Sequence, residues 1–246
     1  MAEDREVLSR PARAPDRILI YGPEADHLAD VRTPARPGTP RPLIIMIHGG
    51  FWRPTIDRTH TGPLAEALAA AGWSVACIEY RRVPGSPQHT LEDVQRALTE
   101  IPGLLSGHDE RVIVMGHSAG GHLALWAASR RPTPQLIGAL ALAPAADLQL
   151  AHELRLGDGA VAAFVGGDAR SHTDLDPRRM PSPAIPTTIV HGEADSIVPS
   201  ALADSYAAAH PAVRLVKLPG AGHFELIDPQ SSHWRAVLAE LDRLAL

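Results

Sequence analysis

The segment Gly116-His117-Ser118-Ala119-Gly120 has the G-x-S-x-G spacing of a serine nucleophile placed on a sharp turn between a strand and a helix. It follows the apolar run RVIVM and precedes the helical pattern HLALWAASR. In such a turn, the residues two before and two after the serine approach each other closely, which favours glycine at both positions. The helix that follows directs its positive end at the reaction centre, where it favours an oxyanion. We therefore predict that Ser118 is a nucleophile.

A serine hydroxyl is a weak nucleophile and needs a base. His223 follows the predicted strand VRLVKL in a glycine-rich loop and is predicted to be this base. Asp195 follows the predicted strand TTIV and is predicted to orient the imidazole. The chain order serine, aspartate, histidine is that of a known hydrolase arrangement on parallel strands. Glu193 and Asp204 compete for the acid role, although the first follows its strand closely and the second lies within a predicted helix.

A glycine-rich segment, His48-Gly49-Gly50-Phe51-Trp52, follows the apolar run LIIMI. A loop of this kind lets backbone N–H groups approach a carbonyl oxygen. We predict the amides of Gly50, Phe51 and Ala119 as oxyanion donors, and His48 as a residue that holds the loop by hydrogen bonds. An ordinary tight turn is the alternative.

The aromatic residues of this segment suggest a substrate pocket beside the oxyanion loop. We expect at least one of Phe51 and Trp52 to line it, and assign Trp52 and His117 to this pocket. His117 and His122 flank the nucleophile and are otherwise interpreted as packing around the turn.

No cofactor or metal site is predicted. The chain has 13 histidines but no H-E-x-x-H pattern, and no G-x-x-x-x-G-K-[ST] loop is present. The single cysteine, Cys77, excludes an internal disulfide and a paired-cysteine zinc site. It lies in an apolar run and is predicted to be a small buried hydrophobe.

The elements that position these residues alternate between apolar strands and helical patterns. Because strands buried on both faces are typical of parallel sheets, the sequence predicts an α/β fold with helices on both faces of the sheet. We predict one domain over residues 1–246, with a polar arm at 1–15 and a cap insertion at 147–186 over the carboxyl edge of the sheet. The predicted strands are 17–21, 43–47, 74–78, 111–115, 136–142, 187–190 and 213–217, with a Pro-rich strand end and turn over 31–41. The predicted helices are 63–71, 90–100 with Thr90 as N-cap, 119–130, 200–209 and 232–244.

Composition excludes several classes of partner. Hydrophobic residues make up 45% of the chain and charged residues 21%, and the formal net charge is −5. No basic stripe indicates nucleic-acid binding. The charged N-terminal segment is not typical of a signal peptide, and no apolar run reaches the roughly 20 residues of a membrane helix. We expect a cytoplasmic protein with a small-molecule partner, while the oligomeric state stays open.

Four segments, HGGFW, GHSAGGHLALWAA, HGEADSIVP and GAGHFELI, together resemble the α/β-hydrolase superfamily. The closest branch is that of the esterases related to kynurenine formamidase (arylformamidase), and the resemblance covers Tyr21 to the C-terminus. It implies a mostly parallel sheet with a short cap. It also implies the triad and the oxyanion donors at the positions named above. Phe51 stands where formamidases often have tyrosine, which is a departure from the pattern.

The resemblance and the residues predict two-step acyl transfer on small carboxylic esters or aryl formamides. A histidine base predicts activity that rises through roughly pH 6–7. Two other readings stay open. The first is a peptidase or thioesterase on the same fold. The second is a binding protein that has lost turnover, although the damaged triad expected of it is not seen in the sequence.

Overall fold

The computed structural model describes residues 3–36 and 38–246, and its centre is an eight-stranded sheet. The strand order is β1-β2-β4-β3-β5-β6-β7-β8. Pairs from β4 to β8 are parallel, whereas β1, β2 and β4 pair antiparallel. The predicted mostly parallel sheet is therefore confirmed. The strands are β1 (Arg17–Ile20), β2 (Leu28–Arg32), β3 (Leu43–Ile47), β4 (Val75–Ile78), β5 (Val112–His117), β6 (Leu136–Leu142), β7 (Thr187–Gly192) and β8 (Arg214–Leu218).

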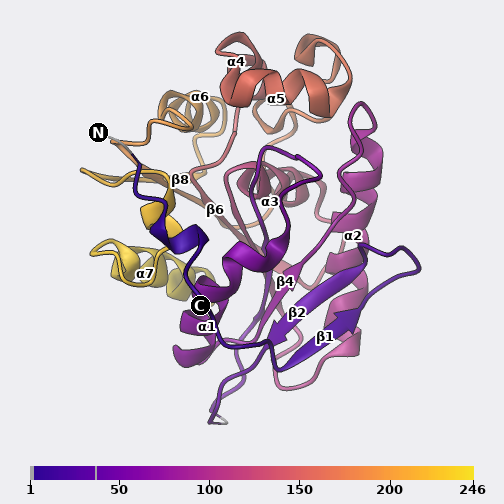
Figure 1. Ribbon diagram of the computed structural model, residues 1–246, viewed down its shortest axis with the longest axis vertical. Helices are drawn as coiled ribbons and strands as arrows, with labels where there is room; N and C mark the ends of the chain where they lie inside the picture. Colours follow the sequence, from indigo (N-terminus) through magenta and orange to yellow (C-terminus); the bar gives the residue numbers. More distant parts are fainter. Residues whose placement is uncertain (1–2, 37) are drawn as a thin grey trace.

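Helices cover both faces of the sheet (Figure 1). The central strands are therefore buried on both sides, which explains their continuous apolar sequences. All residues of β3 and β5 are buried. Apolar side chains of α1 and α7 pack in one core cluster, and those of α2 and α3 pack in another. The main helices are α1 (Gly62–Ala70), α2 (Pro87–Leu104), α3 (Ala119–Arg130), α6 (Ala201–Ala209) and α7 (Trp234–Leu244).

Two sequence expectations need correction. The helix expected at 90–100 is longer, because Pro87 begins it and Ser86 occupies the N-cap position. Thr90 lies inside the helix, and its hydroxyl donates to the carbonyl of Arg81 at 2.6 Å. The Pro-rich stretch was expected to hold only a strand end, but β2 is a full strand between β1 and β4. Pro37, within that stretch, lies outside the described residues.

The segment 147–186 leaves the carboxyl end of β6 and forms α4 (Leu148–Glu153) and α5 (Leu156–Val165), with short 3-10 turns at Ala169–Ser171 and Pro177–Arg179. Figure 1 shows α4 and α5 at the top of the molecule, beyond the strands. The segment is fastened to α3, because Nε2–H of His122 donates to the carbonyl of Leu175 at 2.8 Å. Burial lowers the pKa of His122 to about 4, so the ring is neutral at neutral pH.

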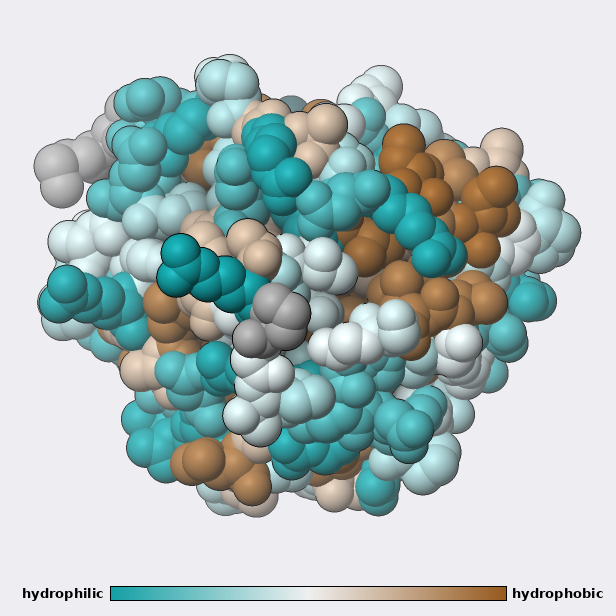
Figure 2. All heavy atoms as spheres, turned by 90° about the horizontal axis from the view of Figure 1, so that it is seen from below, coloured by the Kyte–Doolittle hydropathy of each residue, from teal (hydrophilic) through white to brown (hydrophobic). Residues whose placement is uncertain are grey.

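The end of the molecule opposite α4 and α5 shows mostly hydrophilic residues, with a hydrophobic area to one side (Figure 2). Large exposed apolar side chains include Ile18 and Ile20 of β1, which is an edge strand. Within residues 3–36 and 38–246, no helix combines the length and apolar character needed to cross a bilayer.

Candidate active site

Ser118 stands between β5 and α3 in a strained backbone conformation, with φ 57° and ψ −118°. A non-glycine residue rarely adopts a positive φ, and such strain is common at functional sites. The flanking glycines explain how the turn fits. A Cβ on Gly116 would lie 2.1 Å from the carbonyl oxygen of Gly120, and a Cβ on Gly120 would lie 2.1 Å from that of Ile47. Both positions therefore need glycine, and the second packs against β3.

His223 and Asp195 meet at the carboxyl edge of the sheet. Nδ1–H of His223 donates to Oδ2 of Asp195 at 2.7 Å, and both side chains are buried. The other carboxylate oxygen accepts the N–H groups of Ile197 at 2.9 Å and Val198 at 2.8 Å. Burial alone would raise the pKa of Asp195, but hydrogen bonds from His191, His223 and Val198 hold this pKa well below its usual range. The carboxylate is therefore ionised at neutral pH.

Ser118 and His223 line one cavity of about 720 Å³. In the part of the chain that the structure describes, Oγ of Ser118 makes no hydrogen bond, and Nε2 of His223 has no protein partner. Because Nδ1 carries the proton donated to Asp195, a neutral imidazole has its lone pair on Nε2. The serine–histidine link is therefore open, as links of this kind often are without substrate.

The loop after β3 bends sharply beside the serine. Gly50, Phe51 and Trp52 all have positive φ, at 111°, 55° and 54°. A Cβ on Gly49 would lie 3.0 Å from Cβ of Ser118, so the loop passes directly beside the nucleophile.

The three predicted oxyanion donors have free N–H groups. Among the described residues, the backbone N–H groups of Gly50, Phe51 and Ala119 donate to no protein acceptor. Two of these groups come from the loop after β3, and the third begins a helix. Convergence of such donors can stabilise a developing oxyanion.

A buried histidine supports this loop from below. Nδ1–H of His48 donates to the carbonyl of Gly49 at 2.7 Å, and Nε2 lies 2.9 Å from Oε1 of Glu79. The ring stacks on Tyr80, whose hydroxyl donates to the carbonyl of His48 at 3.0 Å. Both ring nitrogens are engaged with the protein, so His48 holds the loop as expected.

Solved structures that align with this chain over most of its length include several named as esterases. A truncated carbohydrate esterase from gut microbiota aligns with a TM-score of 0.79 at 17% identity, over 93% of this chain and 95% of that one. Esterase B from Lactobacillus rhamnosis, inhibited with a C4-C4 tributyrin phosphonate, aligns with a TM-score of 0.76 at 21% identity, over 95% of this chain and 88% of that one. These likenesses establish the fold. The chain has the α/β-hydrolase fold.

The relatives found by sequence include esterases. The BD-FAE family model matches residues 29–145. Esterase LipC of Mycobacterium tuberculosis is 29% identical over 86% of this chain, which covers 60% of LipC. Kynurenine formamidase of Danio rerio is 30% identical over 52% of this chain and 45% of its own length. The chain thus spans about three-fifths or less of these relatives, and the predicted relation to kynurenine formamidase is confirmed as a distant one.

Trp52 does not line the cavity, which corrects the expectation. Its side chain is 4% exposed and stacks on Phe164 at 4.7 Å between ring centroids. Positive φ at two successive residues turns the indole into the core, whereas Phe51 faces the cavity. His117 does line the cavity, and its Nε2–H donates to the carbonyl of His223 at 3.1 Å. Burial and the neighbouring imidazole lower the pKa of His117 well below its usual value.

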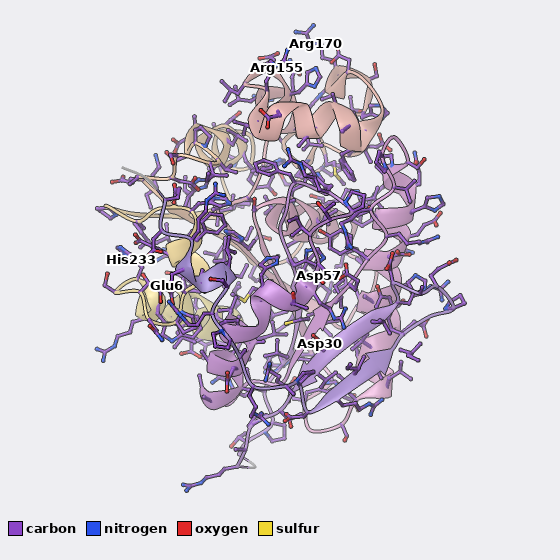
Figure 3. The ribbon with its side chains drawn as sticks, in the orientation of Figure 1. Glu6, Asp30, Asp57, Arg155, Arg170 and His233 are labelled. Atoms are coloured by element: carbon purple, nitrogen blue, oxygen red, sulfur yellow. The ribbon has the colours of Figure 1, made fainter. Side chains whose placement is uncertain are left out.

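Much of the cavity wall carried no recognisable motif in the sequence. The N-terminal arm contributes Arg5 and Leu8, and the cap insertion contributes the segment 154–158. Figure 3 shows Arg155 on the insertion and Asp57 on the segment after β3, lower in the same view. Both residues line the cavity, so it lies between the insertion and the sheet edge.

The competing acids lie elsewhere. The Asp204 carboxylate accepts from Nζ of Lys217 at 2.8 Å, and Glu193 is exposed. Cys77 is buried, and burial raises the pKa of its thiol to about 11. Across the residues that the structure describes, no group of three or more histidine, cysteine or acidic side chains is placed to hold a metal ion.

Proposed function

We propose that this α/β-hydrolase is a serine esterase that cleaves small carboxylic esters through an acyl-enzyme on Ser118. The observation that carries the proposal is the strained serine in one cavity with the His223–Asp195 pair. The esterases among its sequence relatives support the same reading.

In the first step, Nε2 of His223 accepts the hydroxyl proton as Oγ of Ser118 attacks the ester carbonyl carbon. The carbonyl oxygen becomes an oxyanion, which the free N–H groups of Gly50, Phe51 and Ala119 are proposed to bind. The imidazolium then protonates the leaving alcohol, the carbon–oxygen bond breaks, and the acyl group stays on the serine.

In the second step, water attacks the acyl-enzyme, and His223 accepts its proton. The second oxyanion collapses, the imidazolium returns the proton to Oγ of Ser118, and the carboxylic acid leaves. Asp195 keeps the imidazole in the tautomer that both steps need and stabilises the imidazolium.

We propose a small acyl group on an aromatic leaving group as the preferred substrate. The rings of Phe51 and Phe224 line the cavity, and an aromatic leaving group can pack against them. Aryl formamides share this shape, and the distant relation to kynurenine formamidase makes them the amide substrates to test.

The test compares p-nitrophenyl acetate with N-formylkynurenine, using the wild type and Ser118→Ala in parallel. Turnover of both substrates by the wild type alone supports a serine mechanism that extends to formamides. Turnover of the ester alone limits the activity to esters. A series of p-nitrophenyl esters that favours long acyl chains would contradict the small-acyl preference, and a wild type inert towards all substrates would favour a binding protein.

A further inference from the structure

The acid and base loops of the site are joined by a residue of the N-terminal arm. Oε1 of Glu3 accepts the backbone N–H of Ser196 at 2.7 Å and its hydroxyl at 3.0 Å. Oε2 of Glu3 accepts the backbone N–H of His223 at 2.7 Å. Ser196 directly follows Asp195, so one carboxylate bonds the residue beside the predicted acid and the predicted base itself, 193 and 220 positions away in the chain.

The neighbouring glycine shows how closely the carboxylate approaches. A Cβ on Gly222 would lie 2.5 Å from Oε2 of Glu3. Any other residue at position 222 would therefore displace the Glu3 carboxylate. Glycine at this position therefore lets the Glu3 carboxylate reach the amide of His223.

The arm is anchored beyond Glu3, so the contact does not depend on a loose tail. Val7 is 2% exposed and packs in the same core cluster as α1 and α7. Arg10 forms a two-point ion pair with Asp228, with Nη2 and Oδ2 at 3.0 Å. The Arg5 guanidinium lies 5.5 Å from the ring centre of Phe224, the residue after the predicted base.

We propose that Glu3 is a positioning residue for the hydrolase reaction, because it fixes the position of the acid loop relative to the base loop. The proposal rests on the proposed function of Ser118, Asp195 and His223. Hydrogen bonds to an ionised acceptor are stronger than neutral ones, and each oxygen here serves a different loop. Losing the carboxylate therefore removes the contacts of both loops with the arm at once. The hydrogen bonds between Asp195 and His223 and between Ala194 and Ala221 remain, but the imidazole is held less firmly relative to the serine.

A positioning residue and a residue that merely lines the cavity should differ in their effects on kcat and KM. A wall residue contacts substrate, so its loss changes KM and depends on substrate size. A positioning residue changes the alignment of the reacting groups, so its loss lowers kcat even for a small ester and leaves KM unchanged.

The test measures kcat and KM for p-nitrophenyl acetate with Glu3→Ala, Glu3→Gln and Glu6→Ala. Glu6 is the matched control, because it is an exposed glutamate on the same arm and does not line the cavity (Figure 3). We expect Glu3→Ala to lower kcat about tenfold with KM unchanged. Glu3→Gln keeps one acceptor oxygen and should fall between Glu3→Ala and the wild type. Glu6→Ala should match the wild type.

Hydrogen exchange gives a readout that does not need turnover. In Glu3→Ala, the amides of Ser196 and His223 should exchange faster, while the thermal midpoint stays near that of Glu6→Ala. Unchanged kcat and unchanged exchange at both amides would overturn the proposal. If the wild type is active and Ser118→Ala is not, that result leaves the proposed function intact. An inactive wild type with exchange that responds to Glu3 would instead contradict the proposed function alone.

Discussion

Two buried histidine–aspartate pairs in this molecule have the same hydrogen-bond length and different surroundings. His223 meets Asp195 at the carboxyl edge of the sheet, and His27 meets Asp93 between β2 and α2, each at 2.7 Å. In the second pair, Nδ1 of His27 accepts the backbone N–H of Glu24 at 3.1 Å, so both ring nitrogens are occupied. In the first pair, Nε2 of His223 has no partner among the described residues.

The difference shows that pairing with a carboxylate does not itself make a histidine a base. Asp93 is also bound by Arg81, with Nη2 and Oδ1 at 2.6 Å. Burial by itself would raise the pKa of Asp93, but the hydrogen bonds from Arg81 and His27 hold it below its usual value. The His27–Asp93 pair joins α2 to the segments that hold Glu24 and Arg81. Of these two rings, only that of His223 has a nitrogen without a protein partner, and only that ring shares a cavity with the strained serine.

Replacing each histidine tests the comparison most strongly. His223→Ala should lower kcat/KM about 10⁴-fold or more towards p-nitrophenyl acetate, because the serine loses its base. His27→Ala should lower the thermal midpoint and change kcat no more than about twofold. Initial rates and thermal unfolding of both variants decide this. A His27→Ala variant as inactive as His223→Ala, at a temperature where it is folded, would remove the distinction.

Replacing each aspartate should give a similar contrast with a smaller effect on turnover. Asp195→Asn removes the charge that orients the imidazole and should lower kcat by about 10³–10⁴. Asp93→Asn removes the buried carboxylate that Arg81 and His27 both contact and should lower the free energy of unfolding by about 2–4 kcal/mol. Urea unfolding and steady-state kinetics of the two variants measure both effects. Equal losses of kcat would contradict the account.

A substitution in the insertion can change the cavity beside His223 without altering His223 or Asp195. Gly157 and Gly159 both have positive φ in the cap insertion, at 56° and 83°. A Cβ on Gly157 would lie 2.7 Å from the Phe51 ring, whereas a Cβ on Gly159 meets nothing within 4 Å. Gly157→Ala should therefore shift the oxyanion loop and lower kcat about tenfold.

Gly159→Ala is the matched control, because it carries the same kind of backbone strain without the contact to Phe51. Both variants should lose about 1 kcal/mol of stability. Steady-state rates compare them, and equal rates would show that the insertion does not set the position of the loop.

A third histidine–carboxylate pair, His48 with Glu79, gives a stability test with a defined pH window. Burial would raise the pKa of Glu79, but hydrogen bonds from His48 and the nearby Arg82 lower it to about 2. A carboxyl with a lowered pKa stabilises the fold above its unfolded value near 4.5, and this contribution is lost as the pH falls towards 2. Glu79→Gln should therefore be less stable than the wild type at pH 7, with the difference shrinking below pH 4.5. Glu100→Gln, at an exposed position, should show no such change.

The parts of the fold that could be predicted are those with local patterns. The apolar run LIIMI became β3, and the elbow glycines marked the turn that holds Ser118. The two motif loops at Asp195 and His223 also come together, because parallel strands end at one edge of a sheet. Their separation in the chain did not matter to the prediction.

The parts that could not be predicted depend on contacts between distant segments or on backbone angles. No local pattern indicates that Glu3 would reach His223, 220 residues away. The position of Trp52 follows from two successive positive φ angles, which residue type does not reveal. The predicted start of α2 at Thr90 was wrong, because Pro87 suits the first helical position and threonine is also a common N-cap residue.

We infer that Ser118 forms a covalent intermediate with help from His223. The most direct test incubates the wild type, Ser118→Ala and His223→Ala with a p-nitrophenyl phosphonate ester, followed by intact mass and peptide mapping. We expect one phosphonyl group on Ser118 with one p-nitrophenol released, slow labelling of His223→Ala, and no labelling of Ser118→Ala. Equal labelling of Ser118→Ala and the wild type, or no labelling of the wild type, would contradict it.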